Sequence, residues 1–123
     1  MKFTKTHEWL KLEDSDGIVG ITQHAQQEIS DVVFVELPKI GRAVKQGEEV
    51  AVVESVKAAF SIYAPISGTI TRVNDPLAKD PGLINRSPYE QGWIFTISVK
   101  NAGETGSLMD QGQYDKFVQG GGH

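Results

Sequence analysis

Lys57 is the residue of this chain whose type and surroundings most suggest chemistry. It lies within the segment VVESVKAAFSIYAPISG, residues 52–68, between two apolar runs. Its nearest neighbours are small or apolar: Ser55, Val56, Ala58 and Ala59. We therefore expect the ammonium group to project from a smooth tip that a modifying enzyme can reach. The flexible stem suits lysine to carrying a group through an amide bond, and acylation removes its charge.

Two alternatives for this tip remain open from the residues alone. A surface lysine at a turn often serves only solubility or protects an edge strand. The tip also lacks the Asn-Gly or Asp-Gly pair that usually marks a hairpin turn. Either it forms an ordinary type I turn, which accepts most residues, or its residues are kept for displaying Lys57.

The other polar side chains form no recognisable catalytic or metal-binding pattern. The spacing of His7, His24 and His123 is not typical of a metal cluster or a catalytic dyad. The sequence has no G-x-S-x-G motif and no glycine-rich phosphate loop. Glu48 and Glu49 are adjacent, so in a strand they point to opposite faces. We therefore predict a chain that is not an enzyme.

Composition excludes further classes of function. The absence of cysteine removes disulfides and thiolate chemistry, so any redox step must use a cofactor. A formal net charge of −4 argues against binding to nucleic acid or to an anionic membrane. No apolar run approaches the length of a membrane span. We expect a soluble protein of the bacterial cytoplasm, or of the mitochondrial matrix if the source is eukaryotic and a transit peptide has been removed.

Short strands separated by frequent turns must position Lys57. The length of 123 residues fits a single domain, 1–123, in which about 118–123 form a loose tail. Turn residues and β-branched runs predict the following strands: 3–12, 18–21, 31–38, 48–53, 60–64, 69–73 and 92–99. This pattern favours a mostly-β sandwich or barrel.

Helices are predicted to be few and peripheral. Thr22 is expected to cap a short helix over 23–28, and Asp75 a second one that begins at Pro76. Ser107 and Asp110 resemble a capping box before a C-terminal helix that places Tyr114, Phe117 and Val118 on one face. Four aromatic residues are assigned to the core: Trp9, Phe34, Tyr63 and Trp93.

Several motifs together resemble one family. The segment VESVKAA followed by YAPISG resembles the lipoyl-attachment motif of the glycine cleavage system H proteins. Further segments resemble the same family in the same order: THEWL (6–10), GITQHAQ (20–26), VVFVELP (32–38), GLINRSPYEQGWIFTI (82–97) and the C-terminal YDKF. Biotin carriers use a similar hairpin with methionines beside the lysine, where this chain has Val56 and Ala58.

The resemblance implies a fold and a cofactor. The fold would be a flattened barrel-sandwich hybrid of the lipoyl-domain type, with short peripheral helices and a C-terminal helix. A lipoate ligase or lipoyl transferase would attach lipoic acid to Lys57, on a tip formed with Glu54, Ser55, Val56 and Ala58. The dithiolane would supply the sulfur atoms that the chain itself lacks.

The resemblance also implies a carrier role. The lipoyl arm would take an aminomethyl group from glycine decarboxylase to an aminomethyltransferase, and electrons to dihydrolipoamide dehydrogenase. Family members shelter the loaded arm in a cleft, and the matching positions here are Glu8, Ser61 and Glu28. Many members have an acidic residue in place of Ser61, and often a histidine near the end of the short helix, where this chain has Glu28. For Glu8, an exposed strand residue is the alternative.

Two other functions stay open. An H-like protein of this kind could act as a lipoate reservoir that donates lipoyl groups to 2-oxoacid dehydrogenases. The chain could also be an unmodified structural barrel that retains only the fold. Substitution of Lys57 by arginine separates the carrier functions from the structural one, because only a carrier requires an acylated lysine.

Overall fold

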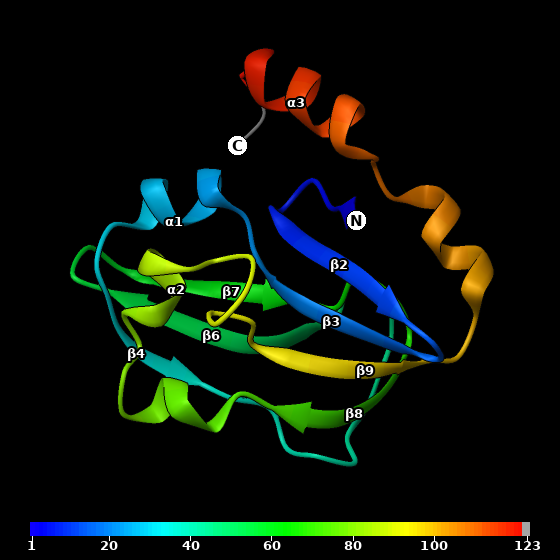
Figure 1. The fold of residues 1–123 in the computed structure, drawn as a ribbon, viewed down its shortest axis with the longest axis horizontal. Coiled ribbons are helices and arrows are strands. Elements are labelled where there is room, and N and C mark those ends of the chain that lie inside the picture. The colour runs from blue at the N-terminus through cyan, green and yellow to red at the C-terminus, as the bar shows by residue number, and fades with distance from the viewer. Residues whose placement is uncertain (122–123) are drawn as a thin grey trace.

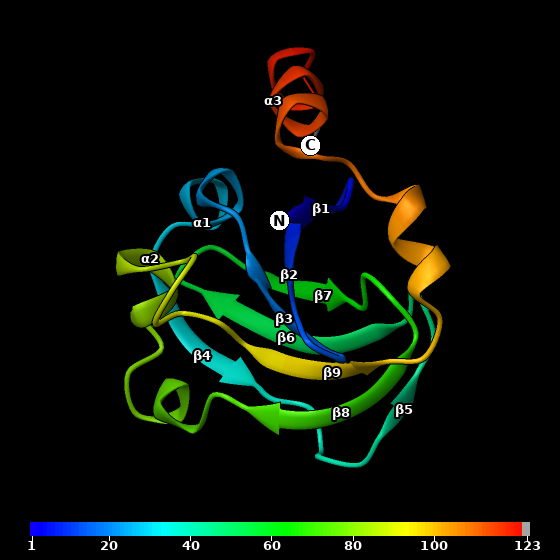
Figure 2. The same cartoon turned by 45° about the vertical axis from the view of Figure 1, so that its right-hand side comes forward.

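Two antiparallel sheets packed against each other form the body of the protein (Figures 1 and 2). The computed structural model describes residues 1–121. The larger sheet has six strands in the order β1-β2-β3-β9-β8-β5. Their bounds are β1 Lys2–Phe3, β2 Glu8–Glu13, β3 Asp16–Ile21, β9 Phe95–Val99, β8 Gly68–Val73 and β5 Ala43–Val44.

The smaller sheet carries the segment around Lys57. It has three strands in the order β4-β6-β7, with bounds β4 Val32–Glu36, β6 Glu49–Ser55 and β7 Ala59–Tyr63. Consecutive strands β6 and β7 form a hairpin whose tip lies beyond Ser55. Within residues 1–121 the two sheets do not join into one closed barrel. The predicted mostly-β architecture is therefore confirmed, in its flattened, sandwich-like form.

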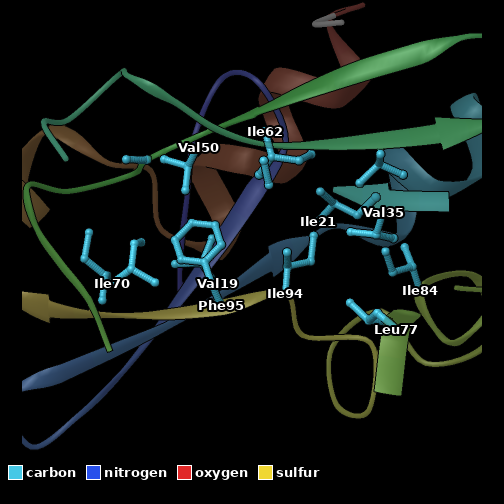
Figure 3. Close-up of a cluster of buried hydrophobic side chains, with 14 of the residues drawn as sticks. Val19, Ile21, Val35, Val50, Ile62, Ile70, Leu77, Ile84, Ile94 and Phe95 are labelled. Carbon is cyan, nitrogen blue, oxygen red and sulfur yellow. The ribbon is translucent and has the colours of Figure 1, made fainter. Parts of the chain in front are cut away.

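The core lies between the two sheets. Figure 3 shows Ile62 and Val50 of the smaller sheet pointing toward Val19 and Phe95 of the larger one. Val19 and Phe95 are fully buried. Burial of side chains of this size stabilises a fold by about 1.5–3 kcal/mol each. The base of the β6–β7 hairpin is therefore fixed by core packing.

Short helices cover the ends of the sandwich. The α-helices are α1 Gln23–Ile29, α2 Leu83–Arg86 and α3 Gln111–Gln119, and the 3₁₀ helices are η1 Asp75–Ala78 and η2 Ala102–Ser107. In Figure 1, α1 lies over the tip end of the β6–β7 hairpin, and α3 lies above β1 and β2. No helix in the described part of the chain is long and apolar enough to cross a membrane.

Several predicted boundaries differ from the observed ones. The predicted strand 3–12 is divided into β1 and β2, because the chain turns between them and His7 has a φ of 71°. Thr22 caps α1 as predicted, since its side chain accepts a hydrogen bond from Ala25 N. Asp75 is not a cap: it is the first residue of η1, which follows Asn74. The capping box begins at Asp110 with Gln113 as its partner, and Ser107 belongs to η2.

Two further expectations are revised at the surface. Phe34 is 51% exposed, because a bulge between Val32 and Phe34 interrupts the alternation of inward and outward side chains in β4. The ordered chain continues further than predicted at the C-terminus, since α3 includes Val118 and Gln119. Residues 122 and 123, and with them His123, lie outside the described residues.

Asn85 of α2 holds the connection between α1 and β4. Its Nδ2 donates to the Ser30 carbonyl (2.9 Å) and to Gln26 Oε1 (3.1 Å). Its Oδ1 accepts from Val32 N at 2.9 Å. One side chain therefore satisfies polar groups at the end of a helix, inside that helix and at the start of a strand.

We predict that Asn85→Asp lowers the free energy of unfolding by about 1–3 kcal/mol. The carboxylate still accepts from Val32 N, but it cannot donate and would face the oxygens of Ser30 and Gln26. Urea unfolding followed by circular dichroism measures the change.

Asn101→Asp is the matched control. The Asn101 side chain only accepts a hydrogen bond, from Gly103 N at 3.0 Å, and an aspartate accepts it equally well. We expect this variant to stay within about 0.5 kcal/mol of the parent. Equal stability of the two variants would contradict the role given to Asn85.

Candidate functional site

Ser55 shapes the tip that carries Lys57. The turn is closed by Ser55 N, which donates to the Ala58 carbonyl at 2.9 Å. The Ser55 hydroxyl oxygen accepts from Lys57 N at 3.1 Å and from Ala58 N at 3.3 Å. None of the residues 55–58 that form this tip has a positive φ angle. The turn therefore needs neither glycine nor asparagine, because the serine side chain satisfies its backbone groups.

Most residues of the tip are exposed to solvent. Lys57 and Ala58 are exposed, and the Val56 side chain is 65% exposed. Glu54, also exposed, lies opposite Phe34 on one neighbouring strand and Ala59 on the other. Pairing with strands on both sides holds the base of the turn in place, while the turn itself remains accessible.

The Lys57 amine lies next to a residue that lines a cleft. Its Nζ donates to the backbone carbonyl of Glu28 at 2.9 Å. Glu28 is also one of the residues that line a cleft of about 260 Å³ between α1 and β7. A group attached to Lys57 therefore begins beside the α1 wall of this cleft.

The cleft combines apolar walls with a polar set of side chains. Its apolar residues come from β3, α1 and β7: Ile21, Ala25, Ile29, Phe60 and Ile62. Its polar residues are Thr6, His7, His24, Glu28 and Ser61. An apolar hollow with a few polar groups is the usual form of a small-molecule site.

Two of the predicted sheltering residues, Glu28 and Ser61, are brought together at this cleft. Glu28 is exposed, and its Oε1 lies 3.8 Å from His24 Nε2, one helical turn earlier. Ser61 comes from β7, and its hydroxyl donates to Glu49 Oε2 at 3.0 Å. The carboxylate at the cleft therefore comes from α1.

The third predicted sheltering residue, Glu8, lies behind the cleft. It lines a neighbouring hollow of about 220 Å³, and Thr6 lines both spaces. The interpretation of Glu8 as an exposed strand residue is wrong, because its side chain is fully buried. One carboxylate oxygen accepts from the hydroxyls of Thr4 and Thr6, and the other accepts from Tyr63 N at 3.2 Å.

Burial controls the charge of Glu8. Loss of contact with water raises the pKa of its carboxyl above the ordinary value of 4.5, because desolvation penalises the ionised form. The hydrogen bonds from Thr4, Thr6 and Tyr63 act in the opposite direction and offset only part of this effect. Glu8 is therefore a carboxyl group that retains its proton to a higher pH than an exposed glutamate.

The grouping of three residues in this region was missed from the sequence. The rings of His7 and His24 lie 4.7 Å apart between centroids, although 17 positions separate them. Tyr114, expected only as part of a helix face, has its hydroxyl 2.7 Å from His7 Nδ1. No local pattern joins these residues, because the turn at His7 and the docking of α3 bring them together. No group of three or more acidic, histidine or cysteine residues able to hold a metal occurs within residues 1–121.

Comparison with known proteins identifies related sequences. Residues 1–121 match the family described as Glycine cleavage H-protein. The glycine cleavage system H protein of Thermotoga maritima is 51% identical over 116 residues, which cover 94% of both chains. The corresponding protein of Deinococcus radiodurans is 55% identical, covering 93% of this chain and 90% of the relative. The mitochondrial glycine cleavage system H protein 2 of Arabidopsis thaliana is 47% identical, covering 97% and 76%.

A solved structure shares the fold. The crystal structure of a glycine cleavage system H protein from Mycobacterium marinum superposes with a TM-score of 0.87 at 34% identity, covering 98% of this chain and 95% of that one. The expected lipoyl-domain type of fold is thereby confirmed. Since the family match spans residues 1–121 and the sequence relatives cover more than nine-tenths of the chain, this protein belongs to the glycine cleavage H-protein family.

Proposed function

We propose that this protein carries the lipoyl group of its family on Lys57 and works as the mobile carrier of the glycine cleavage system. The observation that carries the proposal is the position of Lys57. Its amine stands on an exposed tip held by Ser55 and donates to the carbonyl of Glu28, a residue that lines the α1–β7 cleft. A carrier needs an attachment point that enzymes can reach and a place for the arm between visits.

The residues present fit a lipoyl group. When bound, the group supplies dithiolane sulfur chemistry and transports an aminomethyl group and electrons. Amide formation at Lys57 removes its positive charge, while the exposed neighbours Val56 and Ala58 leave room for the attaching enzyme. The apolar walls of the cleft suit a hydrocarbon arm, because they can bury it from water.

The polar side chains of the cleft give it a second property. The Glu28 carboxylate stands at the entrance, where it attracts a cationic amine on the cargo. Ser61 lines the opposite side from β7, and its hydroxyl donates to Glu49. Glu8 acts from behind by accepting the hydroxyl hydrogen of Thr6, which orients that hydroxyl at the cleft wall.

The proposed partners are three enzymes and one modifying enzyme. They are glycine decarboxylase, an aminomethyltransferase, dihydrolipoamide dehydrogenase, and a lipoate ligase or lipoyl transferase. Their active sites perform the reactions, and this chain contributes no catalytic group of its own. We place this activity in the bacterial cytoplasm or the mitochondrial matrix. The name of the Arabidopsis relative describes that protein as mitochondrial. The alternative of a lipoate reservoir is not favoured by the family match.

We predict that Lys57→Arg abolishes lipoylation and all glycine oxidation, because an arginine cannot form the amide. Peptide mass spectrometry after co-expression with a lipoate ligase detects the lipoyl mass, and reconstitution with the three enzymes measures turnover.

Lys39→Arg is the matched control, since Lys39 is exposed but lies on the loop after β4. This variant should be lipoylated and active like the parent. A parent protein that remains unmodified beside an active ligase would refute the proposed function, as would a lipoyl group found on another lysine.

We predict that Glu28→Gln shortens the lifetime of the cargo on the isolated carrier by roughly 1.5- to 5-fold, the range of an exposed ion pair. The amide keeps the shape of the side chain but loses its attraction for a cationic amine. Ammonia released in the absence of partner enzymes measures cargo loss.

Glu36→Gln provides the control, because Glu36 is an exposed carboxylate on β4 that does not line this cleft. Its rate of ammonia release should equal that of the parent. If both variants behave alike, the carboxylate at position 28 has no sheltering role.

The raised pKa of Glu8 predicts a pH-dependent stability. The folded protein binds the proton of this carboxyl more tightly than the unfolded chain, whose carboxyl has a pKa near the ordinary value of 4.5. Its contribution to the free energy of unfolding is therefore fully present below that value and decreases as the pH rises through the folded pKa.

Urea unfolding of the parent and of Glu8→Gln from pH 4 to pH 7 tests this linkage. We expect the stability of the parent relative to the variant to decline as the pH rises, because glutamine does not titrate. A difference that stays constant, or that grows with pH, would mean that the buried carboxyl is ionised in the folded protein without penalty.

A further inference from the structure

Three segments that are distant in sequence meet at the hydroxyl group of Tyr114. His7 lies in the turn between β1 and β2, Thr22 caps the start of α1, and Tyr114 comes from α3. The Tyr114 oxygen is 2.7 Å from His7 Nδ1 and 2.7 Å from Thr22 Oγ1. The three side chains are all buried.

One partner of this hydroxyl, His7, lines the α1–β7 cleft, and the other, Thr22, caps the helix that forms one wall of it. His7 lines the cleft directly, and its ring lies against that of His24. Thr22 Oγ1 also accepts from Ala25 N at 3.2 Å, so it fixes the first turn of α1. Because His24, Ala25 and Glu28 of the same helix line the cleft, the orientation of α1 determines its shape.

The backbone conformation of the turn at His7 depends on contacts with neighbouring residues. Its φ of 71° is a left-handed conformation that residues with a side chain adopt at a cost. Two backbone hydrogen bonds hold this turn, from His7 N to the Thr4 carbonyl (3.2 Å) and from Thr22 N to the His7 carbonyl (3.0 Å). The Tyr114 hydroxyl adds a contact to the ring itself. Strained residues of this kind persist where surrounding contacts over-determine them, often at functional sites.

Tyr114 is itself firmly placed. Its ring stacks on Phe3 with centroids 4.7 Å apart, and its side chain is 4% exposed. Phe3 is tied to Met109 by two backbone hydrogen bonds, of 2.8 and 2.9 Å, just before α3 begins. Burial raises the pKa of the Tyr114 hydroxyl, which therefore keeps its proton at neutral pH and can donate one hydrogen bond while accepting another.

We propose that Tyr114 is a positioning residue for the carrier: its hydroxyl fixes the His7 ring and the first turn of α1, and thereby sets the shape of the cleft that receives the lipoyl arm. The C-terminal helix thus acts on the cleft without lining it. This inference rests on the proposed function, in which the arm attached to Lys57 occupies the α1–β7 cleft.

A purely structural role for Tyr114 makes a different prediction. If the residue served only to pack α3, the ring stacked on Phe3 would suffice, and removal of the hydroxyl would leave the cleft unchanged. Tyr114→Phe retains the ring and removes only the group that reaches His7 and Thr22. The variant therefore separates positioning from packing.

Tyr89→Phe is the matched control. The Tyr89 hydroxyl accepts a hydrogen bond from Gln23 N at 2.9 Å, also at the first turn of α1. Neither Tyr89 nor Gln23 lines the cleft. Both variants thus remove one tyrosine hydroxyl near the start of the same helix, and only one of them touches His7.

The first measurement uses the full-length chain before lipoylation. Nitrogen-15 NMR of the imidazole groups reports the tautomer and environment of His7. We expect Tyr114→Phe to shift the His7 ring nitrogen signals, with the change extending to His24, while Tyr89→Phe leaves them at the parent positions. Unchanged His7 signals in Tyr114→Phe would overturn the inference.

The second measurement uses the lipoylated carrier loaded with its cargo. We expect Tyr114→Phe to release ammonia about two- to tenfold faster than the parent, the change that corresponds to one lost hydrogen bond, and Tyr89→Phe to match the parent. Equal release from all three proteins would overturn the inference while the carrier function stands. A parent that cannot be lipoylated at Lys57 would instead refute the proposed function, and the NMR measurement would still test the link between Tyr114 and His7.

Discussion

The apolar contact between the two sheets is the constraint on which the rest of this structure depends. Val53 of β6 and Ile62 of β7 are buried in that contact, while Lys57 lies a few residues beyond them in the same hairpin. The hairpin therefore has a fixed base and an exposed end. Loss of the contact would move the tip and one wall of the cleft together, because Ile62 also lines the cleft.

Polar side chains act together with the burial of Ile29 in the core to place the second wall of the cleft. The helix α1 has only seven residues, too few to be stable in isolation. Contacts at both of its ends hold it: Thr22 at the first turn and Asn85 beyond the last. Each hydrogen bond contributes little by itself, but together they fix a short element against a rigid sheet.

Local patterns allowed much of this protein to be predicted, and contacts between distant segments account for what was missed. Alternating apolar residues and turn residues predicted the strands on both sides of Lys57, and Thr22 was correctly predicted as a cap because capping depends on neighbouring residues. The exposure of Phe34 was not predictable in this way, since a bulge reverses the inward and outward pattern. The burial of Glu8 and its bonds to Tyr63 depend on the docking of β2 near β7, which no short segment encodes. The grouping of His7, His24 and Tyr114 has the same origin.

The turn that presents Lys57 separates conformation from recognition. Ser55 supplies the hydrogen bonds that close the turn, and its neighbours keep ordinary backbone angles. The side chains of Val56 and Ala58 therefore do not determine the shape of the turn, and both face solvent. Over evolutionary time, residues at these two positions can change to match a different attaching enzyme while the shape of the loop is inherited unchanged. A scaffold of this kind allows one hairpin to be adapted to new modifying enzymes by single substitutions.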